Sequence, residues 1–283
     1  MSGHAAAGSF RRSVWTPRLV LGASVVSTIV ALAIIGPSIA PYDPTSFAVR
    51  VRLMPPSAAH WFGTDEFGRD VLSRVLSGAH YSLAIGFGAT GICLVIGVSL
   101  GLAAAFHRGV VEAVIMRTID LLISIPPVLL GLLILAVTTP SLWKTILAVG
   151  LIYIPIMTRL TRSVALGLLQ EDFVQAAHAR AEGAASILIR EILPNAWPPI
   201  IVEAGLRITF AILLGSSLSF LGLGPQPPSS EWGLMIAESR QFIDQAPWIG
   251  LAPGLSLCVV LVAVNLFGEG LRESLDPQLQ GTD

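Results

Sequence analysis

Long runs of apolar residues divide this chain into alternating hydrophobic and polar stretches. A membrane-spanning helix needs about 20 mainly apolar residues. Six runs of roughly that length occur, at 19–37, 81–106, 119–137, 142–160, 198–221 and 248–267. Only 12% of the 283 residues are charged, against roughly 25% in an ordinary soluble protein. Six such runs in one chain disfavour the alternative of a soluble protein with a large helical core. The sequence therefore predicts an all-α, polytopic membrane protein with six transmembrane helices.

Basic residues predict the orientation of these spans, because Lys and Arg collect in short cytoplasmic loops. Three regions that lie on one side of a six-span protein are rich in arginine: the N-terminal tail, the second-to-third loop and the fourth-to-fifth loop. Their arginines are Arg11, Arg12, Arg18, Arg108, Arg117, Arg159, Arg162, Arg180 and Arg190. We therefore expect a cytoplasmic tail over 1–18 and a single transmembrane domain over 19–283. Its loop 38–80 would be extracytoplasmic, and its loop 161–197 and both termini cytoplasmic.

Prolines and glycines inside the runs predict local geometry. Pro126 and Pro127 remove two backbone donors from the third run, so we expect a kink there. Gly97 and Gly101 form a small-xxx-small step, which allows close helix contact either within this chain or with another subunit. Several broken spans suit a moving, cavity-lining protein better than a static anchor.

Two polar features stand near the membrane. Glu203 and Arg207 have the helical spacing of an ion pair, and the alternative is a role in a translocation path. The stretch 71–76 is amphipathic, with its apolar positions on one helical face. It predicts a short helix, capped by Thr64 or Asp65, that lies on the membrane surface or over the mouth of the bundle.

The polar stretch 172–194 interrupts the apolar runs yet has the pattern of a folded element. Small residues recur at Ala176, Ala177, Ala179 and Ala181, and an apolar run then ends at Pro194. An alanine-rich helix surface lets another protein approach the backbone closely. The stretch therefore predicts a docking element for a partner on the water side of the membrane.

Motifs for catalysis are not found in this sequence. The chain has a single lysine, Lys144, which is not preceded by a phosphate-binding loop. No Gly-x-Ser-x-Gly elbow and no His-Glu-x-x-His or Cys-x-x-Cys metal spacing occur. We therefore expect no catalytic residue, no metal site and no cofactor in this chain, and the net charge of −1 gives no sign of nucleic-acid binding.

The stretch 172–194 resembles the EAA signature of permease subunits in bacterial ATP-binding-cassette (ABC) importers. That pattern runs Glu-Ala-Ala, three residues, Gly, nine residues, Ile, one residue, Leu-Pro. It falls on 175–177 and on 193–194, with Ile192 one position after the strict isoleucine. Gln175 replaces the acid and Ala181 replaces the glycine, which leaves Gly183 as the candidate for the turn.

Four further segments are similar to the C-type permease subunit of dipeptide, oligopeptide and nickel importers. They are 62–74 (FGTDEFGRDVLSR), 218–224 (LSFLGLG), 232–233 (WG) and 265–277 (NLFGEGLRESLDP). Together they run in order over most of the chain. Such subunits often carry a glutamate shortly before LSFLGLG, where this chain has Gly215, so the resemblance assigns no charged residue to the pathway and the pathway residues stay unknown.

The resemblance implies a type I (MetI-like) importer permease in the bacterial cytoplasmic (inner) membrane. A second homologous permease subunit would complete the pathway through the lipid bilayer, and an extracytoplasmic binding protein would deliver the ligand. Two ATPase subunits would bind ATP and Mg and perform the hydrolysis. The residues implied in ATPase coupling are Asp172, Gln175, Ala176, Ala177, Arg180, Ala181, Glu182, Gly183, Leu193 and Pro194.

Peptides are the expected cargo of such an importer. Nickel or another small solute is the first alternative. A self-sufficient secondary transporter or channel is the alternative from a different class, and it would need buried ionisable groups or inverted repeats.

Overall fold

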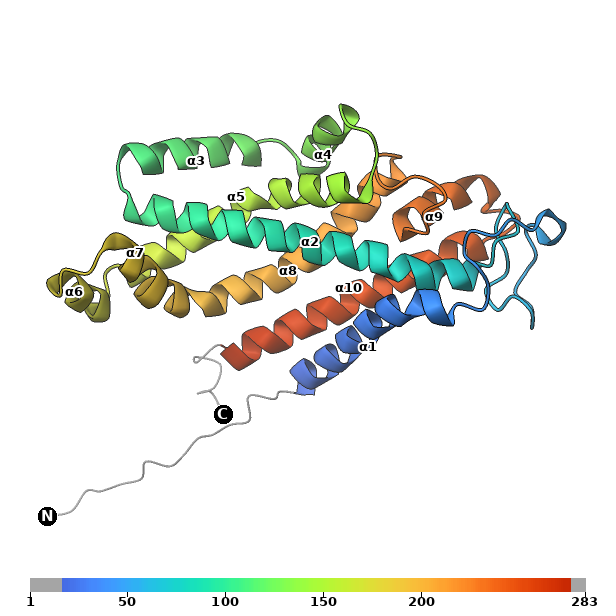
Figure 1. Cartoon of the computed structure of the whole chain (residues 1–283), viewed down its shortest axis with the longest axis horizontal. Coiled ribbons are helices and arrows are strands. Elements are labelled where there is room, and N and C mark those ends of the chain that lie inside the picture. The colour runs from blue at the N-terminus through green and yellow to red at the C-terminus, as the bar shows by residue number, and fades with distance from the viewer. Residues whose placement is uncertain (1–16, 276–283) are drawn as a thin grey trace, which may run out of the picture.

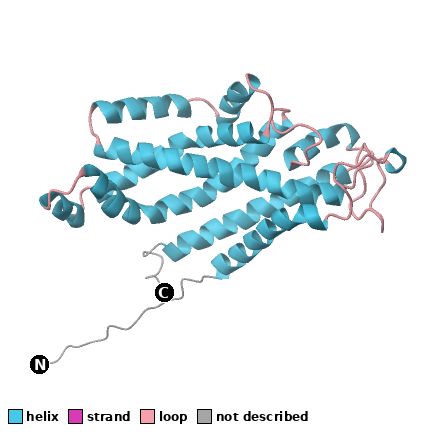
Figure 2. Cartoon of the chain, in the orientation of Figure 1, coloured by secondary structure: helices cyan, strands magenta, loops and turns pink. Residues whose placement is uncertain are grey.

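A computed structural model describes residues 17–275, and these are helical apart from their connecting loops (Figure 2). The ten α-helices of this part of the chain are α1 (Pro17–Ile39), α2 (Val71–Phe106), α3 (Val110–Ile123), α4 (Pro127–Ala136), α5 (Leu142–Leu168), α6 (Asp172–Ala179), α7 (Ala184–Ser186), α8 (Leu193–Phe220), α9 (Trp232–Ser239) and α10 (Trp248–Leu275). Shorter turns are η1 (Val49–Val51), the π-helical η2 (Ile187–Ile192) and η3 (Arg240–Phe242).

Five helical segments are long and apolar enough to cross a membrane, and a bent pair supplies a sixth candidate. The five contain α1, α2, α5, α8 and α10, and the pair is α3 with α4, bent by 93°. The break coincides with Pro126 and Pro127, where α4 begins, because proline cannot donate a backbone hydrogen bond. The predicted all-α membrane fold and its kink are confirmed.

Helix α2 begins ten residues before the predicted start of the second span. The amphipathic stretch 71–76 forms its first turns, so the prediction of a separate surface helix is wrong. Asp70 is the N-cap rather than Thr64 or Asp65, since its Oδ2 accepts the Ser73 N–H at 2.8 Å. At 1.5 Å per residue the 36 residues of α2 extend ~54 Å, more than the ~30 Å of a bilayer core.

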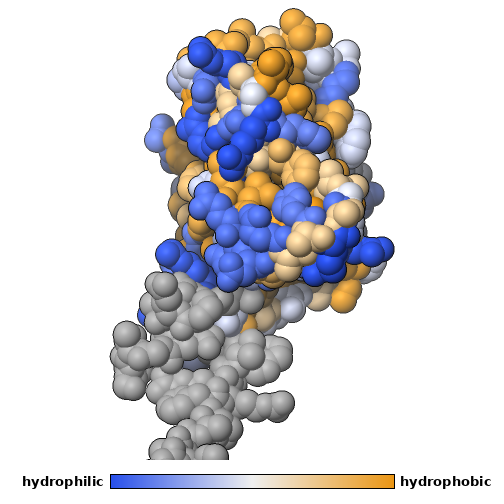
Figure 3. Space-filling view, turned by 90° about the vertical axis from the view of Figure 1, so that its left-hand side faces the viewer, coloured by the Kyte–Doolittle hydropathy of each residue, from blue (hydrophilic) through white to orange (hydrophobic). Residues whose placement is uncertain are grey.

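The polar segments gather at the two ends of the bundle (Figure 1). Helices α6 and α7 lie at one end, and the first turn of α1 and the last turn of α10 point towards this end but stop short of it. The loop between α1 and α2 lies at the opposite end, next to α9. We call these the α6 end and the α9 end. Seen from the α6 end, hydrophilic residues cover much of the surface (Figure 3).

Helices α2 and α5 pack closely through glycine. A Cβ added at Gly97 would lie 2.7 Å from the Cβ of Met157, and one at Gly101 would lie 2.6 Å from the Cβ of Thr161. These distances are shorter than any ordinary carbon contact, so only glycine allows this separation. The small-xxx-small step therefore packs two helices of this chain, in agreement with the first of its two interpretations.

Helices α1 and α10 also touch through glycine, in the part of the pair that points towards the α6 end. A Cβ at Gly22 would lie 2.5 Å from the backbone nitrogen of Phe267, and one at Gly270 would lie 2.4 Å from that of Leu19. The two backbones are therefore in direct contact there, and this contact closes the space between the helices on that side.

The glycine contact between α2 and α5 predicts a specific sensitivity. We expect Gly101→Ala to lower the free energy of unfolding by about 1–3 kcal/mol, because the new methyl group overlaps the α5 backbone. The measurement is the melting temperature of the detergent-solubilised protein. Gly91→Ala on the same helix is the matched control, since a Cβ there meets nothing within 4 Å. Equal effects of the two substitutions would contradict this account of the packing.

Candidate functional site

The 172–194 segment connects α5 to α8 at the α6 end, and its first helix is tied to α5 by a side chain. Gln175 on α6 donates from Nε2 to the carbonyl oxygen of Leu169, which follows the last residue of α5, at 3.0 Å. An ionised glutamate could not make this bond, because a carboxylate only accepts. The replacement of the acid of the family pattern by glutamine thus has a local physical reason.

The turn after α6 is a Schellman motif, in which two amides beyond the helix bond back to its last carbonyls. The Glu182 N–H donates to the Ala177 carbonyl at 3.2 Å, and the Ala181 N–H donates to the His178 carbonyl at 2.9 Å. Ala181 has φ +58°, in the left-handed region that favours glycine. Gly183 has φ −70° and precedes α7, so the assignment of the turn to Gly183 is wrong. The chain keeps the turn at the glycine position of the EAA pattern and accommodates alanine there.

A small polar network braces this turn. Arg180 donates from Nε to Oε1 of Glu182 at 2.9 Å, and Ser186 donates from Oγ to Oε2 of the same carboxylate at 3.0 Å. These bonds, the one from Arg180 above all, hold the pKa of Glu182 below its ordinary value. Glu182 therefore joins the end of α6 to α7.

The inner face of the segment packs against itself and the bundle. Val174 and Ala177 of α6 and Ile187 and Ile192 of η2 are fully buried in one hydrophobic cluster. Ala177 therefore cannot present its methyl group to a partner, and its place in the predicted close-approach face needs correction. The buried side makes the segment a firmly attached projection rather than a loose loop.

The outer face holds most of the other predicted coupling residues. Asp172, Gln175, Ala176, Arg180, Ala181, Gly183 and Pro194 are exposed, whereas Glu182 and Leu193 are half-buried. Pro194 is the second residue of α8 and lies in its first turn, a position that tolerates proline. The segment thus offers a surface of small and polar side chains on a buried support.

The left-handed alanine predicts a stabilising substitution. We expect Ala181→Gly to slow amide hydrogen exchange at 180–182 by roughly five- to thirty-fold, because it removes about 1–2 kcal/mol of backbone strain. Gly183→Ala is the matched control, since its φ of −70° suits any residue, and should not slow exchange. Slower exchange in the control but not in Ala181→Gly would show that the turn depends on Gly183.

A second cluster, at the α9 end, was not anticipated from the sequence as a unit. Oδ2 of the fully buried Asp65 accepts from Nε of Arg69 at 2.6 Å and from Nη1 of Arg74 at 2.7 Å. Arg74 also donates from Nη2 to Oε2 of Glu238 on α9 at 3.0 Å. This network joins the α1–α2 loop, α2 and α9. The i, i+4 spacing of Asp65 and Arg69 was the available signal, but Glu238 lies too far along the chain to be connected from sequence.

Glu231 fastens α9 to the end of α8. Its buried carboxylate caps α9 by accepting the Leu234 N–H at 2.8 Å, and it accepts from Oγ of Ser216 at 3.3 Å. Burial raises the pKa of Glu231 above its ordinary value. The adjacent Gly233 contacts the backbone of Ser216, and Trp232 donates from Nε1 to the Val75 carbonyl at 3.0 Å. The WG motif is therefore the packing point of α9 on α2 and α8.

The ionic network at the α9 end predicts a large loss of stability when one partner is removed. We expect Arg74→Met to lower the free energy of unfolding by about 3–5 kcal/mol, because Asp65 keeps a buried charge with one partner fewer. Thermal unfolding of the solubilised protein measures this loss. Arg50→Met is the control, since Arg50 is exposed at the same end. Similar melting temperatures for the two variants would contradict the assigned role of the network.

Glu203 and Arg207 form an ion pair near the middle of α8. The Arg207 Nε lies 2.7 Å from Glu203 Oε1, and both side chains are more than four-fifths buried. The guanidinium lies 5.4 Å from the ring centroid of Tyr153 and 5.0 Å from that of Phe210. The predicted pairing is confirmed, and charges at such a depth usually face the interior of an assembly or a water-filled path.

Comparison with known proteins places these features in a family. Residues 97–281 match the family described as "Binding-protein-dependent transport system inner membrane component". The dipeptide transport system permease protein DppC of Alkalihalophilus pseudofirmus is 40% identical, over 92% of this chain and 86% of that protein. The probable D,D-dipeptide transport system permease protein DdpC of Escherichia coli is 40% identical, over 94% and 89%.

A related protein and a solved structure extend the comparison. The glutathione transport system permease protein GsiD of Pectobacterium atrosepticum is 38% identical, over 90% of this chain and 85% of that protein. An inward-facing structure of the MetNI methionine ABC transporter aligns with a TM-score of 0.60 at 15% identity, over 71% of this chain and 96% of the matched one. At that identity the structural likeness concerns the fold, which is the predicted MetI-like one.

Proposed function

This chain belongs to the family of binding-protein-dependent transport system inner membrane components, and we propose that it forms half of the pathway of an ATP-driven peptide importer. The observation that carries the proposal is the identity of 40% over about nine-tenths of the chain to permeases named for dipeptide transport. A second, homologous permease subunit would supply the other half of the pathway. These relatives are named for dipeptide or glutathione transport, which favours peptides over nickel as cargo.

The 172–194 segment is the proposed contact with an ATPase subunit. Its exposed face carries Ala176 and Ala181, where small side chains allow close approach, and Arg180 and Asp172 at the rim provide charge. Its buried face is continuous with the hydrophobic cluster of the bundle through Ile187 and Ile192. A movement of the ATPase against the exposed face would therefore be transmitted to α5 and α8, because the segment is packed against the bundle.

The proposed orientation puts the α6 end and both termini in the cytoplasm. The α6 end carries several arginines, in keeping with the distribution of basic residues in cytoplasmic loops. They are Arg159 and Arg162 in the last turns of α5, and Arg180 and Arg190 in the 172–194 segment. The ATPase subunits would bind ATP and Mg there and perform the hydrolysis. The binding protein would dock at the α9 end, where the buried ionic network holds the surface in shape.

The proposed pathway runs along α8, on the side of its ion pair. The exposed Phe210 and Leu213 and the half-buried Ser217 follow Glu203 and Arg207 at helical spacing on that helix. This stretch of α8 therefore combines charged, polar and aromatic residues. A path for a zwitterionic peptide needs polar groups that are already neutralised by partners, and the Glu203–Arg207 pair provides this.

Uptake assays test the proposal. A strain that lacks the importer, complemented with the whole system, should recover uptake of a labelled dipeptide but not of nickel. We expect Ala176→Arg to weaken ATPase association by roughly 30-fold or more, about 2 kcal/mol, because the exposed alanine would carry a bulky charge into the contact. Association is measured by co-purification of the ATPase subunits, and uptake should fall in parallel.

The control for this experiment is Ala58→Arg, an exposed alanine of the α1–α2 loop at the α9 end. It should leave ATPase association intact. Ala177→Arg is unsuitable, since Ala177 is buried and the substitution would disturb the fold. Normal co-purification and uptake in the Ala176→Arg variant would exclude the 172–194 segment as the coupling contact, and nickel uptake without dipeptide uptake would exclude the peptide assignment.

A further inference from the structure

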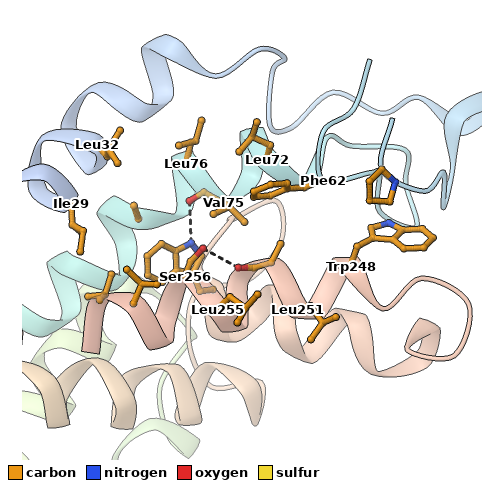
Figure 4. Close-up of a pocket in the computed structure, with 16 residues that line it drawn as sticks. Ile29, Leu32, Phe62, Leu72, Val75, Leu76, Trp248, Leu251, Leu255 and Ser256 are labelled. Carbon is orange, nitrogen blue, oxygen red and sulfur yellow. Dashed lines mark hydrogen bonds between the residues drawn. The ribbon is translucent and has the colours of Figure 1, made fainter. Parts of the chain in front are cut away.

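An apolar groove of about 530 Å³ opens between α1, α2 and α10 towards the α9 end (Figure 4). Ile29 and Leu32 of α1 form one wall, and Leu255 and Val259 of α10 form the other. The floor is formed by α2, including Val75. The volume lies within the ~300–1,000 Å³ usual for small-molecule sites.

The polar side chains of the lining already donate their hydrogen bonds within the protein. Ser256 donates from Oγ to the Ala252 carbonyl at 2.9 Å. Trp232 donates from Nε1 to the Val75 carbonyl at 3.0 Å, and Trp248 donates from Nε1 to the Thr64 carbonyl at 3.2 Å. Water or a peptide in the groove would lose hydrogen bonds that these walls cannot replace. The chemistry of the groove selects a purely hydrocarbon occupant.

The groove is continuous with surfaces that face lipid. Among the five unbroken candidate spans of the described residues, α1 and α10 are the least buried, at 22% and 33% of their most apolar windows. The rim residues Leu251, Leu255 and Val259 are all more than half exposed. Trp248 stands at the α9 end of the groove, in keeping with the tryptophan belt at membrane interfaces. The opening therefore meets the hydrocarbon of the leaflet on the α9 side.

The shape of the groove suits a flexible chain better than a helix. The backbone contacts at Gly22 and Gly270 close it towards the α6 end, and Phe62 and Trp248 lie over it at the α9 end. A helix with its side chains is about 10 Å across and needs an open channel along its length. A groove of this volume that is closed at both ends has no room for several helical turns.

We propose that this groove holds one acyl chain of a membrane phospholipid. The chain enters between α1 and α10 and contacts Val75 and Ala79 on the floor, where it also meets the ring of Trp232. It fills the space that α1 and α10 leave open and supports the packing of α9 on α2. The site requires only the membrane location of the family and does not depend on the identity of the transported solute.

Photolabelling of the assembled importer tests the proposal. The importer is reconstituted in vesicles of phosphatidylethanolamine and phosphatidylglycerol, with a trace of phosphatidylglycerol that carries a diazirine within one acyl chain. Mass spectrometry then locates the adducts. Val75 and Ala79 are each 6% exposed and are reached from the bilayer through the groove. Adducts on these two residues are expected.

The adduct pattern of the wild type is compared with those of two variants that fill the groove, Ala252→Phe and Ser256→Phe. Two variants are used so that the comparison can still be made if one of them does not fold. Each should abolish the adducts on α2 and retain those on the exposed Ile34 and Ile35 of α1. Ala31→Phe is the matched control, because Ala31 is exposed on α1 outside the groove, and its adduct pattern should equal that of the wild type.

Three results would overturn the proposal. Adducts on Leu32 and Leu255 without any on α2 would mean that bulk lipid touches only the rim. Adducts on α2 that persist in both filling variants would place the lipid elsewhere. Protection of the rim and the floor together in the assembled importer would mean that a partner subunit covers the groove.

Discussion

The close contact of α2 with α5 supports the rest of this structure. In lipid, helix association rests on close packing rather than on hydrophobic burial, and glycines at the contact make the closest packing possible. Gly97 and Gly101 supply this contact from α2, and Gly150 supplies it from α5. Helix α2 begins beside the ionic network at the α9 end, and α5 leads into the 172–194 segment at the α6 end. The pair therefore connects the two polar ends through the membrane as one unit.

The fully buried charged side chains in the described part of the chain lie where they find partners. At the α9 end, Asp65, Arg74 and Glu238 neutralise one another through direct hydrogen bonds. Within α8, Glu203 and Arg207 pair on a single helix. The groove at α1 and α10 is the opposite case, since its few polar atoms are satisfied by the backbone. All three features have the same physical cause, because an unpaired polar group in an apolar medium is costly. The ionic network and the ion pair satisfy their charges, and the groove has no unsatisfied polar side chain.

Two departures from the EAA signature show how a motif can change while its geometry persists. Ala181 adopts the left-handed conformation that glycine would take, and the Schellman bonds around it compensate for part of the strain. Gln175 donates to a backbone carbonyl, which the usual acid could not do. The position in the turn, rather than the residue type, is what the fold retains.

The sequence by itself determined the membrane fold, the spans and the break at Pro126, because apolar length and missing backbone donors act locally. It also located the 172–194 segment and the Glu203–Arg207 pair, whose partners lie close along the chain. Only the tertiary structure decided the start of α2, the burial of Ala177, the left-handed Ala181 and the union of Arg74 with Glu238. These depend on contacts between distant residues, or on which of several local conformations the packing selects, and neither follows from periodicity or composition.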